Sequence, residues 1–127
     1  MSATPEQVLI ERYLAAYNRF DIDGMLAPLA PDVRFENWNG GEMTVSSEGI
    51  DAFRALAEQA RGMFSQREQR IAALSAHGSI VLAIIEWRGT LAVDVADGPP
   101  AGTALELRGE SEFGFADGRI ASIVDRS

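Results

Sequence analysis

Apolar side chains recur at helical spacing in the first part of the chain. Residues 4–7, TPEQ, have the composition of a helix start, because Thr can cap, Pro tolerates the first position and Gln can complete a capping box. Large apolar and aromatic residues then follow every three or four positions. The pattern predicts a helix over residues 5–20 whose buried face carries Tyr13 and Tyr17.

A break and a change of period follow this helix. Residues 21–24, DIDG, end it, and Asp23 is expected to cap a short helix over residues 24–29. A period of two then predicts a first strand over residues 33–37. One face of this strand would carry Val33, Phe35 and Asn37.

Helical spacing returns near the middle of the chain. Residues 39–41, NGG, read as a turn, and the stretch up to residue 47 fits either a loop or a short strand. An apolar stripe then predicts a third helix over residues 49–65, with Phe53 and Phe64 on its buried side.

The second half of the chain changes to a strand pattern. Asp117-Gly118 between alternating segments is a strong hairpin signal, because the turn requires positive φ angles. The predicted strands cover residues 70–75, 80–93, 103–115 and 119–125. Helices that all precede an antiparallel meander must pack on one face of it, which predicts an open, cone-shaped α+β domain with a pocket, over residues 1–127 as one domain.

Alternation assigns the two faces of the predicted sheet. In residues 103–115 the odd positions are mostly apolar and would face inward, so that Ser111 is the lone polar side chain there. Its hydroxyl either bonds a neighbouring group or contacts a ligand. The strand at residues 80–93 is apolar on both faces, and a second copy of the chain would cover the outer one, which carries Ile80, Leu82 and Ile84. We therefore expect a homodimer through the sheet.

Composition narrows the classes of partner. The net charge of -8 argues against nucleic acid and anionic membranes, and the N-terminal residues lack the features of a signal peptide. No apolar run approaches the ~20 residues of a membrane span. The chain has no cysteine, and its single histidine, His77, lies in a predicted turn. We expect a cytoplasmic protein with no metal site and no cofactor.

Four stretches carry a resemblance to a known family. They are VLIERYLAAYNRFDIDGMLAPLAPD (8–32), EGIDAF (48–53), EWRGT (86–90) and FGFADGRIASIVD (113–125). Together they are similar to the SnoaL-like and ketosteroid isomerase-like branch of the nuclear transport factor 2-like superfamily. The resemblance covers nearly the whole chain, but most of the matching positions are structural. It implies the cone-shaped fold more strongly than any single activity.

Residue by residue, the resemblance transfers only part of the isomerase site. Tyr13 matches the tyrosine of ketosteroid isomerases, but their aspartate base falls on Asn37 and their second acid on Ser111. An amide accepts no proton near neutral pH, so the resemblance implies that this isomerase machinery is incomplete. Tyr13 and Ser111 could still donate hydrogen bonds to a carbonyl oxygen. The alternative is that Tyr13 is a core residue whose hydroxyl lies at the edge of the pocket.

Asp125 is the first candidate for acid-base chemistry. It lies five residues after Ile120, where the resemblance to SnoaL-type cyclases implies an acidic residue on the last strand. If it faces inward with Ile123, burial would raise the pKa of its carboxyl group. The alternative is a solvated aspartate near the chain end. The Asp-Arg-Asp set of epoxide hydrolase relatives is incomplete, because its other members fall near Trp87 and Gly89.

Two functional classes remain open. The first is an isomerase-, cyclase- or hydrolase-like enzyme, or a binding protein, for a small apolar and oxygenated molecule. The second is a non-catalytic dimeric binding module of the same fold. In the first, Asp125 and Tyr13 would be catalytic, and the ligand would contact side chains that could equally be core: Tyr17, Asn37, Trp38, Phe53, Phe64, Trp87 and Ser111.

Overall fold

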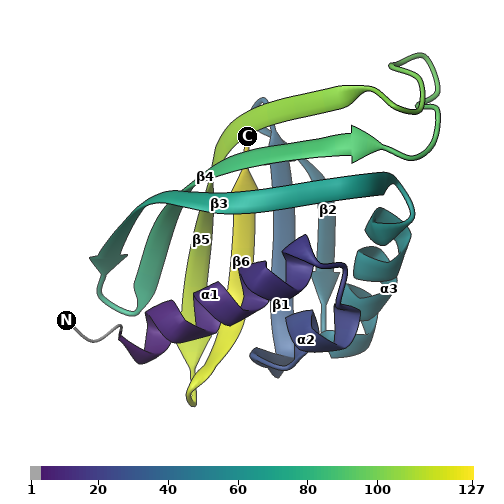
Figure 1. Ribbon diagram of the computed structural model, residues 1–127. Helices are drawn as coiled ribbons and strands as arrows, with labels where there is room; N and C mark the ends of the chain where they lie inside the picture. Colours follow the sequence, from purple (N-terminus) through teal and green to yellow (C-terminus); the bar gives the residue numbers. More distant parts are fainter. Residues whose placement is uncertain (1–3) are drawn as a thin grey trace.

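A computed structural model describes residues 4–127, as three helices and six strands (Figure 1). The helices are α1 (Pro5–Asn18), α2 (Ile22–Leu26) and α3 (Ile50–Arg61). The strands are β1 (Leu29–Asn39), β2 (Glu42–Glu48), β3 (Phe64–His77), β4 (Ile80–Leu91), β5 (Ala104–Ala116) and β6 (Arg119–Arg126).

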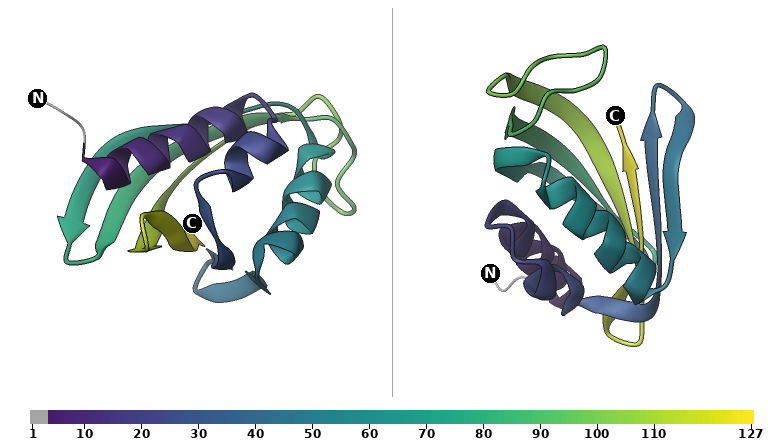
Figure 2. Two further views of the ribbon diagram at one scale, coloured as in Figure 1. Left: turned by 90° about the horizontal axis from the view of Figure 1, so that it is seen from below. Right: turned by 90° about the vertical axis from the view of Figure 1, so that its right-hand side faces the viewer.

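The six strands form one mixed sheet in the order β2-β1-β6-β5-β4-β3. The pairing of β1 with β6 is parallel, and the other pairings are antiparallel. The sheet is strongly curved, and the three helices lie on its inner face (Figure 2). The predicted α+β class, with helices packed on a curved sheet, is confirmed; the sheet is open rather than a closed barrel.

The first two helices start at side-chain caps. The Thr4 hydroxyl accepts a hydrogen bond from the Gln7 backbone N–H over 3.1 Å, as the sequence predicted. The expected cap of the short helix was wrong by two residues. Asp21 caps α2 by accepting from the Gly24 N–H over 3.0 Å, and Asp23 instead pairs with Arg54 on α3.

The middle of the chain differs from the expectation in two places. Residues 42–48 form a full strand, β2, that pairs with β1. The third helix ends at Arg61 rather than at residue 65, and Phe64 opens the long strand β3. Gly62 follows the last helical residue, and the chain leaves the helix there, although the apolar stripe continues to Phe64.

The core lies between α1, α2, α3 and the inner face of the sheet. The largest side chains that are completely buried come from α1, β1, β5 and β6 and are Phe113, Ile10, Leu29, Ile120, Ile123 and Val33. The inward alternation predicted for the fifth strand is confirmed for Ser111 and Phe113, which are both buried. Core packing thus fixes the strand pair β5–β6 directly beneath α1.

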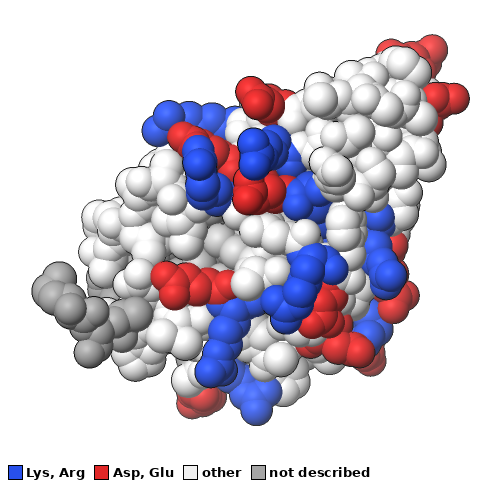
Figure 3. All heavy atoms as spheres, viewed as in Figure 1, with Lys and Arg blue, Asp and Glu red and all other residues white. Residues whose placement is uncertain are grey.

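The surface mixes charges of both signs. On the side seen in Figure 3, acidic and basic side chains lie next to one another and alternate with uncharged areas. In the part of the chain that the structure describes, no helix is long and apolar enough to cross a membrane.

Candidate functional site

A row of residues crosses three strands on the inner face of the sheet. Asn37 on β1 pairs in register with Asp125 on β6, and Asp125 pairs with Ser111 on β5. Ser111 in turn pairs with Ala83 on β4. Residues paired in register point to the same side of a sheet. The structure therefore brings three of the predicted site residues, Asn37, Asp125 and Ser111, into contact range at one level.

The Asp125 carboxyl group is the ionisable group of this row. The buried Ser111 hydroxyl donates to Asp125 Oδ1 over 2.6 Å, and no protein group among residues 4–127 is bonded to the second oxygen, Oδ2. Burial raises the pKa of Asp125 to about 6, and the Ser111 hydrogen bond offsets part of this rise. At neutral pH the group is mostly a carboxylate and about one tenth carboxylic acid, so it can both accept and donate a proton.

Tyr13 faces this row from α1. Its ring packs against Phe53 on α3 and Phe113 on β5, with ring centroids 6.3 and 6.2 Å away. Burial, and to a smaller extent the Asp125 charge, raise the pKa of Tyr13 well above its ordinary value, so the hydroxyl stays protonated. It has no hydrogen-bond partner in the described chain and is free to donate to a bound molecule.

Tyr17 lies one helical turn after Tyr13 and belongs to a second group of contacts. Its hydroxyl accepts a hydrogen bond from Trp87 Nε1 over 2.9 Å, and Trp87 packs edge-on against Phe64 with ring centroids 5.2 Å apart. Burial raises the pKa of Tyr17, so its own proton remains available to an acceptor. Among the predicted wall residues, Tyr17 and Phe64 thus each contact Trp87, while Phe53 packs against Phe35 and Tyr13.

Arg67 is a buried arginine on the inner face that was not among the residues predicted from the sequence. It lies opposite Gly89 in the β3–β4 pair and is 5% exposed. Its Nε donates to the Tyr17 carbonyl oxygen over 3.0 Å, and its guanidinium stacks 3.7 Å from the centre of the Tyr17 ring. The strand predicted from the sequence begins at residue 70, whereas β3 begins at Phe64, so Arg67 lies outside the predicted strand. Alternation counted back from Ile71 through Gln69 places Arg67 on the inner face, whereas alternation counted from Phe64 does not, because the β3–β4 pairing shifts between Phe64 and Gln66.

Asn37 is held by the neighbouring hairpin strand. Its side-chain Nδ2 donates to the Thr44 hydroxyl over 3.0 Å, and the Thr44 hydroxyl donates to the Asn37 carbonyl oxygen over 3.2 Å. The amide thus lies beside Asp125 in the sheet while its N–H is bound to β2. In this row, Asp125 is the side chain that can exchange a proton, and Asn37 contributes an uncharged polar amide.

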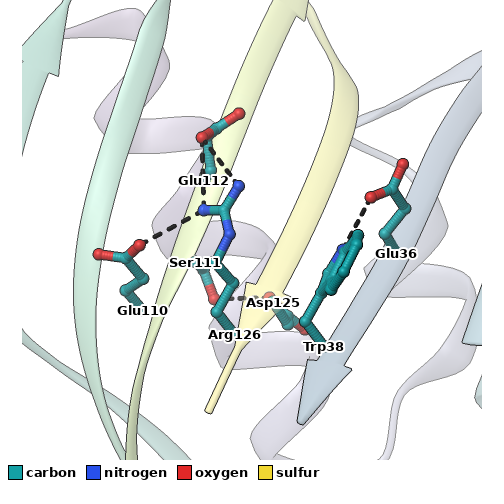
Figure 4. Close-up of polar contacts among 7 residues, drawn as sticks. All are labelled: Glu36, Trp38, Glu110, Ser111, Glu112, Asp125 and Arg126. Atoms are coloured by element: carbon teal, nitrogen blue, oxygen red, sulfur yellow. Dashed lines mark hydrogen bonds and ion pairs between the residues drawn. The ribbon is translucent and has the colours of Figure 1, made fainter. Parts of the chain in front are cut away.

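Trp38 is not part of this arrangement. It pairs in register with Arg126, whose side chain reaches Glu110 and Glu112 on the outer face of the sheet. The Trp38 indole N–H donates to Glu36 over 2.8 Å on the same outer side (Figure 4). Because neighbouring residues of a strand point to opposite faces, the inward turn of Asn37 sends Trp38 outward. The expectation that Trp38 lines the inner pocket is corrected by this placement.

Two surface hollows lie away from Asp125. One, of about 460 Å³, is bordered by Trp87, Leu107 and the charged side chains of β3, β4 and β5. The other, of about 730 Å³, lies between the start of α1 and the β3–β4 and β5–β6 turns. Within residues 4–127 no group of three His, Cys, Asp or Glu side chains is placed to hold a metal ion.

Comparison with known proteins identifies the family. The family model described as "SnoaL-like domain" matches residues 10–123, which is most of the chain. The chain belongs to the SnoaL-like family. Among curated proteins none gives a significant match.

Solved structures show the same fold. A candidate polyketide cyclase from Xanthomonas campestris is similar over 97% of this chain and 90% of its own, with 28% identity and a TM-score of 0.81. An NTF2-like protein of unknown function from Burkholderia pseudomallei has 20% identity and a TM-score of 0.79, over 97% of this chain and 90% of that one. A protein from Catenulispora acidiphila with a ketosteroid isomerase-like fold has 15% identity and a TM-score of 0.76, over 97% and 85%. The resemblance inferred from the sequence is therefore confirmed.

Proposed function

We propose that this chain binds a small, largely apolar molecule that carries a carbonyl or hydroxyl oxygen, and that Asp125 transfers a proton to or from it. The observation that carries the proposal is the inward-facing Asp125 carboxyl group, which Ser111 holds by one oxygen. The other oxygen is left for a ligand. A pKa of about 6 suits a group that must both take up and release a proton near neutral pH.

Each neighbour of Asp125 has a part in this proposal. Ser111 fixes the orientation of the carboxyl group and limits the rise in its pKa. Tyr13 offers a free hydroxyl that can donate to a ligand oxygen, where negative charge develops when a proton leaves the adjacent carbon. Phe53 and Phe113, which flank Tyr13, supply apolar surroundings that strengthen such a hydrogen bond.

The similar Xanthomonas protein is named as a candidate polyketide cyclase, and polyketides are oxygenated carbon skeletons. That name supports proton transfer next to a carbonyl group as the reaction class for this chain. Removal of such a proton gives an enolate, whose oxygen would accept from Tyr13, and the Asp125 carboxylate would become a carboxylic acid. Return of the proton completes the cycle without any other reactant.

Exchange of the carbon-bound protons next to the carbonyl of 2-tetralone, in deuterated water, tests the proposal. We expect the wild-type protein to exceed Asp125→Asn by about 100-fold, with a rate that rises with pH and levels off above about pH 6 as the carboxylate forms. Tyr13→Phe should be slowed as well, and Asp32→Asn, an exposed control, should match the wild type. Equal exchange by wild type and Asp125→Asn would refute proton transfer by Asp125.

The amide at position 37 favours a second candidate, a non-catalytic binding module. Ketosteroid isomerases place their base where this chain has Asn37, which cannot take up a proton. A module that only binds would take up 2-tetralone without accelerating exchange. We also expect no isomerisation of a 3-oxo-Δ5-steroid by the wild type, and activity lost on Asn37→Ala would contradict that expectation.

We further propose that two copies associate through the outer face of the sheet. Leu82, Glu112 and Val124 form one row across β4, β5 and β6 on that face. Ile80 and Ile84 flank Leu82 on β4, and all three are only partly buried. The apolar strip of Ile80, Leu82 and Ile84, bordered by the ion pairs of Arg126 with Glu110 and Glu112, fits a self-complementary contact between two copies.

A further inference from the structure

We propose that the guanidinium of Arg67 binds an oxyanion, most simply a carboxylate, of the ligand held between α1 and the sheet. This names the substrate class as an apolar acid. The inference rests on the proposed ligand site, but it does not depend on proton transfer by Asp125.

The first observation is that Arg67 is a buried cation without a carboxylate partner. Arg67 is 5% exposed, and no Asp or Glu side chain among residues 4–127 lies within ion-pair distance of it. The arginines that do pair with carboxylates are all on the surface: Arg19, Arg34, Arg54, Arg70, Arg88 and Arg126. A buried charge ordinarily has a partner, because loss of its hydration is costly.

The second observation is the number of donors left over. A guanidinium has five N–H groups. Nε–H donates to the Tyr17 carbonyl oxygen, and Nη2 lies 3.9 Å from the Met25 sulfur, a weak acceptor. For the remaining N–H groups, two on Nη1 and one on Nη2, the described chain offers no acceptor besides the Tyr17 side chain, and Nη1 is not closed off from solvent. Two of them could meet the two oxygens of a carboxylate in the side-by-side geometry that arginine favours.

The stacking of Arg67 limits the direction from which an anion can approach. The Tyr17 ring lies 3.7 Å and the Phe20 ring 4.6 Å from the central carbon of the guanidinium. These rings lie against the guanidinium, so an anion would have to meet its N–H groups from a direction that the rings leave free. Tyr17 and Phe20 also fix the orientation of the group in advance, which reduces the entropy lost on binding.

Arg67 and Asp125 are two opposite charges at different positions on the inner face of the sheet. The Arg67 charge lowers and the Asp125 charge raises the pKa of both Tyr13 and Tyr17. The pKa of Asp125 itself is set by burial and Ser111, with no contribution from Arg67. Both tyrosines therefore lie within reach of the Arg67 charge and of the Asp125 charge. A ligand whose oxyanion meets Arg67 would place its more distant carbon atoms beside Tyr13 and Asp125.

A purely structural role accounts for only part of these contacts. The bond to the Tyr17 carbonyl places a cation at the negative end of α1, which stabilises the helix. That role requires one N–H group and would be met as well by an exposed arginine or lysine. It does not explain why the guanidinium is buried with Nη1 left unpaired by the protein.

A matched pair of probes, 2-naphthoate and 2-naphthamide, tests the proposal at about pH 7.5, where only the former is an anion. Calorimetric titration gives the two dissociation constants. In a Trp38→Phe background the indole N–H of Trp87, which is bonded to Tyr17, is the single indole reporter in NMR spectra and locates the probe. We expect the wild type to prefer naphthoate by about tenfold or more. Arg67→Met should lose this preference, Arg67→Lys should keep part of it, and the exposed control Arg12→Met should keep all of it.

Three results would overturn the proposal: equal binding of both probes by the wild type, an unchanged preference in folded Arg67→Met, or no naphthoate binding at about 1 mM. The first and third results do not depend on the folding of any variant at Arg67. Asp125→Asn separates this inference from the proposed chemistry. Asp125→Asn should still prefer naphthoate to naphthamide. If the wild type shows this preference but does not accelerate proton exchange in 2-tetralone, only the role proposed for Asp125 is refuted.

Discussion

The Ser111 hydroxyl donates to the Asp125 carboxyl group across the β5–β6 pair over a distance of 2.6 Å. The two residues are 14 positions apart in the chain and lie directly opposite each other because of the register of the hairpin that joins their strands. The contact joins a buried hydroxyl to a carboxyl group whose proton affinity is increased by burial. The chemistry proposed for this chain depends on that pair.

Asp125→Asn should stabilise the protein at neutral pH but not in acid. The native pKa, about 6, exceeds the ~3.9 of an unfolded chain, so between these values the native state holds a proton that the unfolded state has released. The free energy of unfolding of the wild type therefore loses about 2 to 3 kcal/mol from this group as the pH rises from 4 to 7. Asn carries no such penalty.

Urea unfolding of wild type and Asp125→Asn at a series of pH values gives this difference directly. The exposed variant Asp32→Asn separates loss of a surface charge from loss of the partly buried Asp125 carboxyl group. A stability difference between wild type and Asp125→Asn that stays constant from pH 4 to pH 7 would argue against a raised native pKa.

Ser111→Ala should raise the pKa of Asp125 further. The hydroxyl stabilises the carboxylate by hydrogen bonding, and its removal leaves the effect of burial unopposed. The pH dependence of proton exchange in 2-tetralone should then move to higher pH by the same amount. Ser122→Ala, on the same hairpin, is a suitable control. An unchanged profile in Ser111→Ala would show that the Ser111 bond does not act on Asp125 in solution.

Asn37→Asp should also raise the pKa of Asp125, because it adds a second carboxyl group directly opposite in the β1–β6 pair. Two adjacent carboxylates repel each other, so one of them keeps its proton to higher pH. Asn39→Asp, two positions along the same strand, should have a smaller effect. If both variants shift the titration equally, the row of Asn37, Asp125 and Ser111 is not the arrangement in solution.

The dimer is tested by the mass in solution. Light scattering should give about 27.4 kDa, twice the 13.7 kDa of one chain. Ile84→Glu places a charge in the outer apolar strip and should shift the mass toward the monomer, with helix content retained. Val93→Glu is the matched control, because Val93 is an exposed apolar residue outside the sheet. A wild-type monomer at micromolar concentration would contradict the proposed association.

Periodicity predicted much of this fold because most elements have one clearly apolar face. The inward turn of Ser111 and Phe113 followed from simple alternation in one long strand. Alternation failed where two elements meet with little polar sequence between them. The apolar stripe of α3 continues into Phe64, so the predicted helix extends into β3. Arg67 was therefore assigned to neither face of the sheet.

Tertiary geometry determined the parts of the site that the sequence left open. Whether Asp125 was buried or solvated near the chain end could not be decided from spacing, because it depends on the β5–β6 register and on the cover that α1 provides. The missing carboxylate partner of Arg67 was likewise invisible, because it concerns every residue that packs around one side chain. The sequence itself proposed Asp125, Tyr13 and Ser111 as candidate site residues, and the structure places the Ser111 hydroxyl against the Asp125 carboxyl group.

The most direct test of the account is an NMR titration of the Asp125 carboxyl carbon, assigned by comparison with Asp125→Asn. The account predicts a midpoint near 6, because burial disfavours the carboxylate and only the Ser111 hydroxyl opposes that effect. A midpoint at or below the ~3.9 of a free aspartate would mean that the carboxyl group is solvated, and the proposed proton transfer would be wrong.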